Sequence, residues 1–187
     1  IYTQQDTPEV DIRNPEHHYI FVWCDEQVYF CEELFTNTDG AHGRRSHEKM
    51  WNHPTSTDPL LAKAMINLSG KDKFIDPFCG AGGIVIEGRL LGLRCSGSDI
   101  SRPMIGRAQQ NAQALGVHAD FSVQDALFYG RSAPAIVSDL PYGKNSSTGG
   151  EELHELYRKF FIIAEGFTTV MVLGMLATTD VKSLIKD

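Results

Sequence analysis

The sequence predicts an α/β fold in which a mostly parallel sheet carries helices on both of its faces. From residue 57 onward, short β-favouring runs alternate with segments whose apolar residues recur at helical spacing. A turn containing three glycines joins the strand Lys73–Asp76 to the helix that follows it. Four predicted strands end in an aspartate, namely Asp76, Asp99, Asp125 and Asp139. Because the carboxyl ends of parallel strands meet at one edge, where open α/β sheets bind ligands, these aspartates predict a ligand site there.

The composition is that of an ordinary globular domain, since 42% of the 187 residues are hydrophobic and 22% are charged. No apolar run reaches the roughly eighteen residues that a membrane span needs, and no signal peptide is visible. We therefore expect a cytoplasmic protein with reduced thiols. The chain begins at Ile1 rather than at a methionine, which indicates a fragment. The net charge of −7 is unusual for a domain that binds nucleic acid by itself.

Residues 1–50 are expected to form an N-terminal tail, a β-hairpin and a linker. Two β-favouring runs, 18–24 and 28–34, predict the hairpin, and three polar residues separate them. The polar segment 36–52 carries a basic cluster made of Arg44, Arg45, His47 and Lys49. This cluster fits either a solvated linker or a patch that contacts substrate phosphates. We expect no metal site, because no carboxylate or cysteine lies at ligand spacing from the nearby histidines.

The first helix of the main domain is predicted to begin at Thr57 or Asp58, either of which can cap it, and to stop at Gly70. Its apolar face is expected to consist of Leu60, Leu61, Ala64, Met65 and Leu68. The hydroxyls of Thr55 and Ser56 precede this helix, where they suit an anion such as a carboxylate. Simple N-capping accounts for them equally well.

The glycine-rich turn after residue 76 is not a dinucleotide fingerprint. A G-x-G-x-x-G motif that starts at Gly80 needs its third glycine at position 85, where Val85 stands. The helix after the turn is expected to bury Ile84, Val85, Leu90 and Leu91. Asp99 lies seventeen residues beyond Gly82, at the end of the second strand. An acid at this position is placed to accept hydrogen bonds from ribose hydroxyls.

The later elements continue the alternation and bring the predicted sheet to five strands. They are a strand at 94–100, a helix at 101–115, strands at 119–125 and 135–139, a helix at 151–165, a strand at 169–173, and the start of a helix at 179–186.

These motifs resemble those of a known enzyme family. The segment Asp76–Gly82, with Asp99, Asp125 and Asp139–Tyr142, resembles the S-adenosylmethionine-dependent amino-methyltransferases. The segment His53–Leu68 is similar to the one that precedes the glycine turn in archaeal tRNA guanine-10 N2-methyltransferases, which carry an N-terminal THUMP RNA-binding domain. The resemblance covers roughly residues 50–175.

The resemblance implies a Rossmann-like methyltransferase domain over residues 51–187, with residues 1–50 containing a remnant of a THUMP-type domain. Enzymes of this family usually have seven strands, so the five predicted here imply a chain truncated at its C-terminus. The implied cofactor is S-adenosylmethionine, which leaves as S-adenosylhomocysteine. The implied cofactor-binding residues are Thr55, Ser56, Asp76, Phe78, Cys79, Gly80, Gly82, Asp99, Ile100, Asp125, Ala126 and Asp139.

The sequence Asp139-Leu140-Pro141-Tyr142 supplies the predicted catalytic residues. The lone pair of a base's exocyclic amine is delocalised into the ring, so the amine is a poor nucleophile. Two hydrogen-bond acceptors, the Asp139 carboxylate and the Leu140 carbonyl, would localise that lone pair and aim it at the methyl group. Pro141 stiffens the turn, and Tyr142 offers an aromatic face on which a flipped base stacks.

Several substrates remain compatible with this motif. The first reading is a tRNA guanine N2-methyltransferase, in which an N-terminal RNA-binding domain supplies most of the phosphate contacts. The alternatives are methylation of adenine N6, cytosine N4 or a protein glutamine, and a non-enzymatic subunit that binds the cofactor. The segment upstream of the glycine turn favours tRNA, while Asp139 and Tyr142 argue against a non-enzymatic role.

Overall fold

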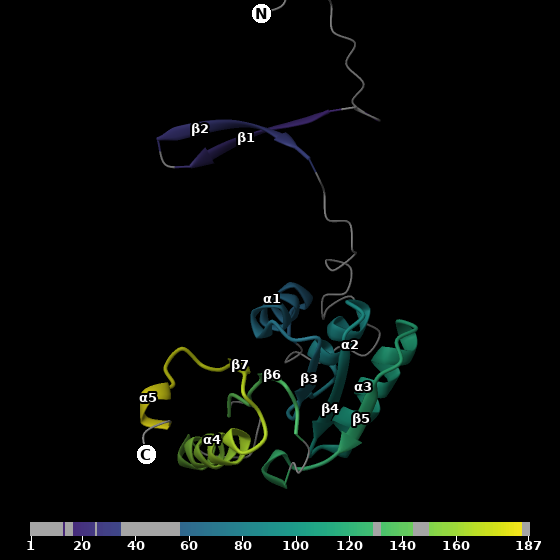
Figure 1. Cartoon of the computed structure of the whole chain (residues 1–187), viewed down its shortest axis with the longest axis vertical. Helices are drawn as coiled ribbons and strands as arrows, with labels where there is room; N and C mark the ends of the chain where they lie inside the picture. The colour runs from purple at the N-terminus through teal and green to yellow at the C-terminus, as the bar shows by residue number, and fades with distance from the viewer. Residues whose placement is uncertain are drawn as a thin grey trace, which may run out of the picture. The chain divides into compact units, whose positions relative to one another are not determined.

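The computed structural model describes residues 13, 17–24, 26–34, 57–128, 132–143 and 150–184, apart from the side chains of 150–152. The chain divides into two compact units, residues 1–39 and 40–187 (Figure 1). The predicted domain boundary at residue 50 and the division at residue 39 both fall between described segments. No helix among the described residues is long and apolar enough to span a membrane.

The first unit contains the predicted hairpin. Strands β1 (His18–Cys24) and β2 (Gln27–Glu33) pair antiparallel, with Phe21 opposite Phe30. The rings of Tyr19 and Phe30 stack with their centroids 5.1 Å apart, which is the kind of cross-strand aromatic pair that stabilises a sheet.

The second unit is built on a five-stranded parallel sheet. Its strands are β3 (Lys73–Asp76), β4 (Arg94–Asp99), β5 (Asp120–Val123), β6 (Ile136–Asp139) and β7 (Met171–Gly174). They lie in the order β5-β4-β3-β6-β7, and every pair is parallel. From β3 the chain adds β4 and then β5 on one side, and it then returns to place β6 and β7 on the other side of β3. The crevice between β3 and β6 is therefore the topological switch point, where open α/β sheets bind ligands.

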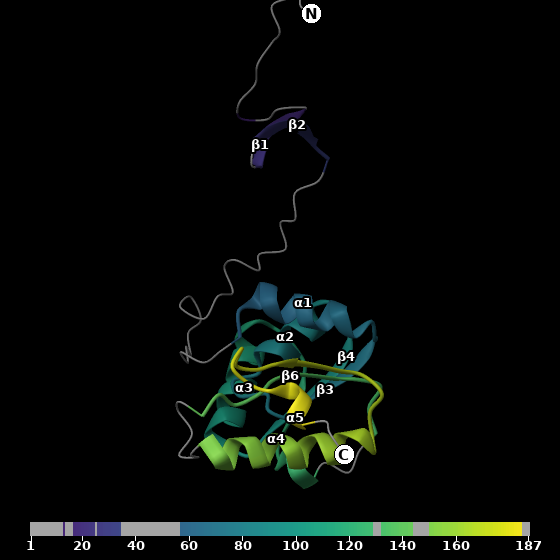
Figure 2. The same ribbon diagram turned by 90° about the vertical axis from the view of Figure 1, so that its left-hand side faces the viewer.

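Helices cover both faces of this sheet, as the sequence predicts (Figures 1 and 2). They are α1 (Pro59–Ser69), α2 (Gly83–Leu90), α3 (Arg102–Ala114), the 3-10 helix η3 (Ala126–Phe128), α4 (Gly150–Glu165) and α5 (Val181–Leu184). Helices α1, α2 and α3 share one hydrophobic core with β3, β4 and β6. Helices α4 and α5 form the second core on the opposite face.

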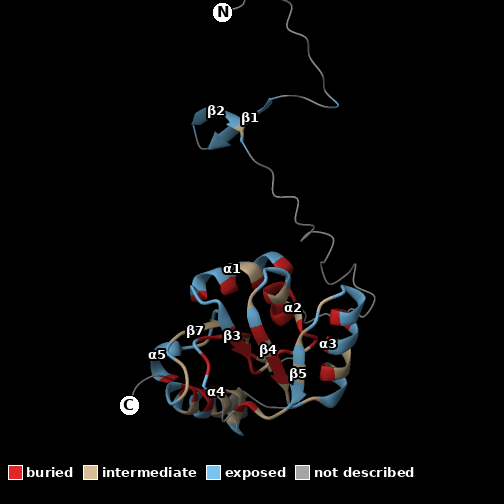
Figure 3. Cartoon of the chain, turned by 45° about the vertical axis from the view of Figure 1, so that its right-hand side comes forward, coloured by how far each residue is buried: buried red, intermediate tan, exposed pale blue. Residues whose placement is uncertain are grey.

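The predicted apolar face of α1 is correct only at Met65. Asp58 caps the helix and Gly70 ends it in a left-handed conformation, as expected, but Leu60, Leu61 and Leu68 are exposed. Figure 3 shows that α1 carries both buried and exposed residues. The buried stripe is instead made of Pro59, Ala62, Met65, Ile66 and Ser69.

The predicted apolar stripe of α2 is correct only in its first half. Ile84 and Val85 are buried, whereas Leu90 and Leu91 are exposed. Gly88 packs against the sheet, because a Cβ there would lie 2.6 Å from the Phe74 ring. Close approach of helix and strand decides which residues of this short helix are buried.

A buried ion pair joins α1 to α2. Nζ of Lys63 lies 3.9 Å from Oε2 of Glu87, and their side chains are 12% and 2% exposed. Because losing one partner of a buried pair leaves an uncompensated charge, replacing either residue alone would destabilise the packing of α1 on α2. The N-terminus of α1 lies beside the glycine turn, since Thr57 lines the same pocket as Gly80.

The third strand is shorter than the sequence predicts. β5 ends at Val123, and Asp125 lies beyond it at the start of η3. The Asp125 carboxylate accepts a hydrogen bond of 2.9 Å from the Leu127 amide. Such a local side-chain cap competes with the strand ladder and turns the chain. Asp76, Asp99 and Asp139 do end their strands as predicted.

Candidate active site

A small pocket lies at the carboxyl edge of the sheet, where β3 and β6 diverge. It encloses about 50 Å³ and is formed by the glycine turn, the residue before the N-cap of α1 and the end of β6. Its lining residues are Thr57, Asp76, Phe78, Cys79, Gly80, Ala81, Gly83, Ile84 and Asp139. The structure thus brings together two of the predicted strand-end aspartates with most of the predicted glycine turn.

Hydrogen bonds from the backbone and from one side chain anchor the glycine turn to the rest of the domain. The Cys79 amide donates to the Ser98 carbonyl at 2.9 Å, and Nδ2 of the buried Asn111 donates to the Ala81 carbonyl at 3.0 Å. Gly80 has a φ of +50° and no atom within 4 Å of the position a Cβ would take. The turn is therefore open above Gly80, and its backbone is accessible to a ligand.

Gly82 needs to be glycine for a different reason. Its φ is +86°, and a Cβ there would lie 2.9 Å from the Phe121 ring. It does not line the pocket, so its predicted contact with a cofactor remains a prediction. Packing of α2 and the turn against β5 explains this glycine.

Asp76 is the buried carboxyl group at the base of the pocket. It is 2% exposed, and its Oδ1 accepts hydrogen bonds from the Ser138 hydroxyl at 2.6 Å and from the Phe78 amide at 3.2 Å. Burial raises the pKa of Asp76 to about 7, with smaller contributions from the carboxylates of Asp99 and Asp139, while the two hydrogen bonds oppose the rise. The group is thus poised to ionise near neutral pH.

Cys79 is a structural residue of the turn. Burial raises the pKa of its thiol far above the usual value, and the nearby carboxylates of Asp76 and Asp99 add to this effect. Because the thiolate is the reactive form of cysteine, this residue is not a nucleophile.

Asp99 connects β4 to the glycine turn. Its Oδ2 accepts from the Gly80 amide at 3.0 Å, and its Oδ1 accepts from the Ser101 amide at 2.8 Å. A carboxylate has about four lone-pair positions, so each oxygen keeps capacity for one more donor. Its neighbour Ile100 is 71% exposed, and neither residue lines the small pocket. Asp125 and Ala126 also lie outside it.

Each carboxylate oxygen of Asp139 already accepts one hydrogen bond within the protein. The Thr57 hydroxyl donates to Oδ2 at 3.1 Å, and the Tyr142 hydroxyl donates to Oδ1. Burial, reinforced by the Asp139 carboxylate, raises the pKa of the Tyr142 phenol, which therefore stays protonated as a donor. A substrate amine that reaches Oδ1 either uses the second lone pair of that oxygen beside the Tyr142 hydroxyl or displaces the hydroxyl.

The turn that follows Asp139 is anchored at two further points. The Leu140 amide donates to the Gly174 carbonyl at 2.9 Å, and the Leu140 side chain is 1% exposed. The Pro141 carbonyl accepts a hydrogen bond of 2.5 Å from the hydroxyl of Tyr157, a buried residue of α4. β7 and α4 together fix the backbone of the predicted catalytic segment.

Several residues of this site are not predicted from the sequence, among them Thr57 as a pocket residue, Ser138, Tyr157 and Gly174. Tyr157 is identified only as part of an apolar helix face, and isolated hydroxyls and glycines carry no local signal. Thr55, Ser56 and the basic cluster at 44–49 lie outside the described residues. In the part of the chain that the structure describes, no group of three potential metal ligands occurs.

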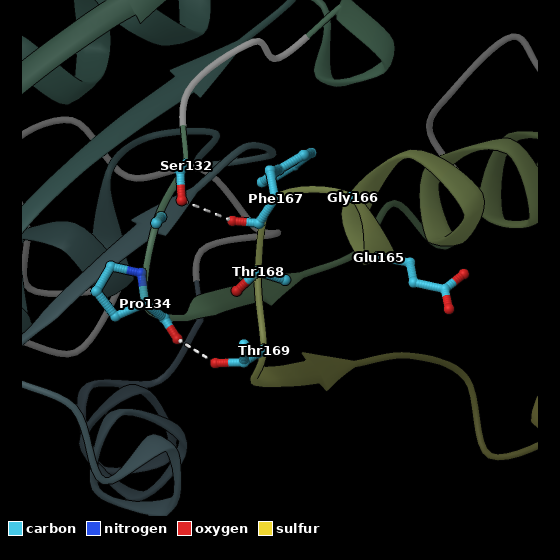
Figure 4. A pocket seen from close by; sticks show the side chains of 8 residues that line it. Ser132, Pro134, Glu165, Gly166, Phe167, Thr168 and Thr169 are labelled. Carbon is cyan, nitrogen blue, oxygen red and sulfur yellow. Dashed lines mark hydrogen bonds between the residues drawn. The ribbon is translucent and has the colours of Figure 1, made fainter.

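A larger cavity of about 360 Å³ lies at the amino edge of the sheet (Figure 4). It is formed by residues 132–134, before β6, and 165–169, before β7. Its hydroxyls are already used, since Ser132 donates to the Phe167 carbonyl and Thr169 to the Pro134 carbonyl. This cavity lies at the opposite end of the strands from the aspartates and is not part of the candidate site.

Comparison with known proteins gives consistent matches. The family model UPF0020, described as an RMKL-like methyltransferase domain, matches residues 46–186. A tRNA (guanine(10)-N2)-dimethyltransferase of Methanothermobacter thermautotrophicus is 44% identical over 123 residues, which cover 62% of this chain and 36% of that protein. The enzyme of the same name from Pyrococcus abyssi is 36% identical over 124 residues, which cover 62% of this chain and 37% of that protein. The chain thus spans little more than a third of the length of these relatives.

A solved structure agrees with the fold. The crystal structure of a "predicted N6-adenine-specific DNA methylase" from Listeria monocytogenes superimposes with a TM-score of 0.58 at 20% identity. The superposition covers 71% of this chain and 46% of that one. At this identity the likeness shows the fold alone.

Proposed function

The chain belongs to the UPF0020 family of RMKL-like methyltransferase domains, and on this premise we propose that it methylates the exocyclic N2 amine of a guanine in tRNA. The methyl donor is S-adenosylmethionine. The observation that carries the proposal is the position of Asp139, which lines the same small pocket as the glycine turn at the switch point of the sheet. The names of the two tRNA (guanine(10)-N2)-dimethyltransferase relatives support the choice of tRNA guanine.

The residues at the carboxyl edge fit S-adenosylmethionine. Gly80 leaves open space above the turn, and Asp99 keeps lone pairs for ribose hydroxyls. The buried Asp76 carboxyl stabilises positive charge in the pocket when it is ionised. When bound, the cofactor supplies a methyl group that its sulfonium makes electrophilic. The proposed contact residues are Thr55, Ser56, Asp76, Phe78, Cys79, Gly80, Gly82, Asp99, Ile100, Asp125, Ala126 and Asp139.

The segment 139–142 binds and orients the substrate amine. Oδ1 of Asp139 accepts one N–H of guanine N2 after the Tyr142 hydroxyl turns away, and the Leu140 carbonyl accepts the other. Two acceptors favour rehybridisation of the nitrogen and point its lone pair toward the pocket, and the nitrogen releases one proton to water once it carries the methyl group. Holding reacting atoms in line supplies much of the rate in such a reaction. The freed Tyr142 ring stacks on the base.

We also propose that most of the affinity for tRNA comes from an N-terminal RNA-binding domain, of which residues 1–50 contain a THUMP-type remnant, while residues 51–187 form the catalytic domain. The net charge of −7 supports this division, because phosphate neutralisation by basic groups dominates RNA affinity. Such an enzyme acts in the cytoplasm. If residues 1–187 alone bound tRNA at submicromolar concentration in physiological salt, this division would be wrong.

The substrate is tested with a chain that includes the regions its relatives carry. Transfer of labelled methyl groups from S-adenosylmethionine to bulk tRNA is compared with transfer to an oligodeoxynucleotide, and digested tRNA is examined for N2-methylguanosine. We expect label in N2-methylated guanosine only. Label in adenine, cytosine or protein would contradict the assignment, and cofactor binding without transfer would indicate a non-enzymatic role.

A further inference from the structure

We propose that Gly174, the last residue of β7, is a positioning residue for Asp139, because its missing side chain is the space in which the Asp139 carboxylate lies. This inference rests on the proposed function, since it assigns Gly174 to the geometry of amine capture. Gly174 is paired with Asp139 in the parallel ladder of β6 and β7.

The steric relationship is direct. A Cβ built on Gly174 would lie 2.3 Å from Oδ1 of Asp139 and 3.2 Å from its Cγ. Separations below about 3 Å do not occur in packed interiors, so a side chain at 174 requires the carboxylate to move. Gly174 is not among the glycines with positive φ, so its backbone conformation is open to any residue. Space, and not conformation, is what makes glycine necessary here.

The Asp139 side chain has little freedom to give way. Its Oδ2 is held by the Thr57 hydroxyl, 82 residues away in the chain, and its Oδ1 by the Tyr142 hydroxyl of the turn that follows it. Rotation away from a new Cβ at 174 would break one or both hydrogen bonds. Oδ1, the Asp139 oxygen nearest to Gly174, is also the one proposed to accept the hydrogen bond from the substrate amine.

Gly174 acts on the second acceptor as well. Its carbonyl accepts the 2.9 Å hydrogen bond from the Leu140 amide, which continues the pairing of β6 with β7 one residue past the strand. Gly174 therefore affects both proposed acceptors. Its missing side chain leaves room for the Asp139 carboxylate, and its carbonyl fixes the backbone that carries the Leu140 carbonyl. The end of β7 defines the shape of the amine site without contacting the substrate.

The test is Gly174→Ala in the active full-length enzyme. We expect kcat for tRNA methylation to fall by about 10²-fold, the effect of misplacing a catalytic group by about 1 Å. The Kd for S-adenosylmethionine should change by less than about tenfold, since all of the proposed cofactor contacts except Asp139 are untouched. Gly106→Ala on α3 is the matched control, because a Cβ there meets no atom within 4 Å. It should leave kcat unchanged.

A double-mutant cycle separates positioning from a general packing defect. In the Asp139→Ala background the nearest remaining atom of residue 139 is its Cα, 3.5 Å from the new Cβ, which is an ordinary contact. Gly174→Ala should therefore lower the melting temperature by roughly 2–4 °C in the parent enzyme and leave it unchanged in the Asp139→Ala enzyme. It should likewise cause no further loss of single-turnover rate in that background.

The outcomes are distinct. Equal destabilisation by Gly174→Ala in both backgrounds, or an undiminished kcat in the single variant, would overturn the inference. A parent enzyme that methylates no exocyclic amine would instead overturn the proposed function, and the inference with it. Coupling between residues 139 and 174 in both stability and rate would establish Gly174 as the positioning residue.

Discussion

The Ser138 hydroxyl donates a 2.6 Å hydrogen bond to Oδ1 of Asp76, and this bond joins the ends of β6 and β3 at the switch point of the sheet. Both residues are at most 2% exposed. Ser138 is the neighbour of Asp139 in the chain, so the bond couples the floor of the proposed cofactor pocket to the strand that presents the amine acceptor. It also bears on the first prediction, because it opposes the rise in the pKa of Asp76.

Asp76→Asn should change how stability depends on pH. The pKa of Asp76 is about 7 in the folded protein against a usual value of 3.8, so between about pH 4 and pH 7 the folded state retains a proton that the unfolded state has lost. This group therefore makes the free energy of unfolding fall as pH rises through that window and contributes no slope above it. Asparagine does not titrate, and it keeps an oxygen for Ser138 and Phe78.

The measurement is urea denaturation of parent and variant across the window. The free energy of unfolding of Asp76→Asn, relative to the parent, should increase from pH 4 to pH 7 and then level off. A difference that stays constant with pH would show that Asp76 is already ionised in the folded protein.

Asp139→Ala should act mainly on the chemical step. Loss of one preorganised electrostatic partner lowers turnover by roughly 10²–10³-fold. The affinity for S-adenosylmethionine, measured by calorimetry, should change by less than about tenfold, or 1.4 kcal/mol. Asp139→Asn keeps an acceptor oxygen and should retain more activity than alanine. Near-normal single-turnover methylation together with loss of cofactor binding would make Asp139 a cofactor ligand instead.

Tyr142→Phe and Tyr142→Ala should separate the two roles of this side chain. Phenylalanine keeps the ring for stacking and frees Oδ1 of Asp139 from its hydroxyl, so the KM for tRNA should not exceed that of the parent. Alanine removes the ring and should weaken base capture by about 1–3 kcal/mol. Steady-state kinetics on the same tRNA check both. Equal losses in the two variants would mean that the hydroxyl, and not the ring, serves the substrate.

Asp99→Ala should weaken binding of S-adenosylmethionine by about 1.5–3 kcal/mol, the range for a hydrogen bond to a charged group. Asp120→Ala is the matched control, because this exposed aspartate lies at the opposite end of the neighbouring strand β5. Calorimetry with the cofactor alone is the measurement. Unchanged affinity in Asp99→Ala would show that Asp99 does not bind the ribose hydroxyls of the cofactor.

Much of this architecture follows from local patterns. Asp58 and Pro59 start α1, Gly70 ends it, and β3, β4 and β6 each end at the predicted aspartate. These features are readable because caps, turns and apolar runs depend on residues only a few positions apart. The alternation of strands and helices is likewise enough to predict a parallel sheet covered on both faces.

Local sequence patterns fail to predict the structure where two conformations or two buried faces have similar local propensity. Met65 belongs to both possible stripes of α1, and only the packing of the helix against α2 and the sheet selects Ala62 and Ile66 over the leucines. Asp125 satisfies the strand pattern, yet its side chain caps η3 instead. In each case tertiary packing or a side-chain hydrogen bond decides between alternatives of similar propensity.

The sequence by itself determined the order of the elements, the glycine turn and the aspartates at the strand ends, since each depends on neighbours in the chain. Only the tertiary structure placed Thr57 against Asp139, 82 residues away, and Ser138 against Asp76, 62 residues away. It alone set Gly174 beside Asp139, because strand order and register in the sheet decide which residues meet. A hydroxyl or a glycine has no local pattern that reveals its partner, so these contacts appear only once β6 lies between β3 and β7.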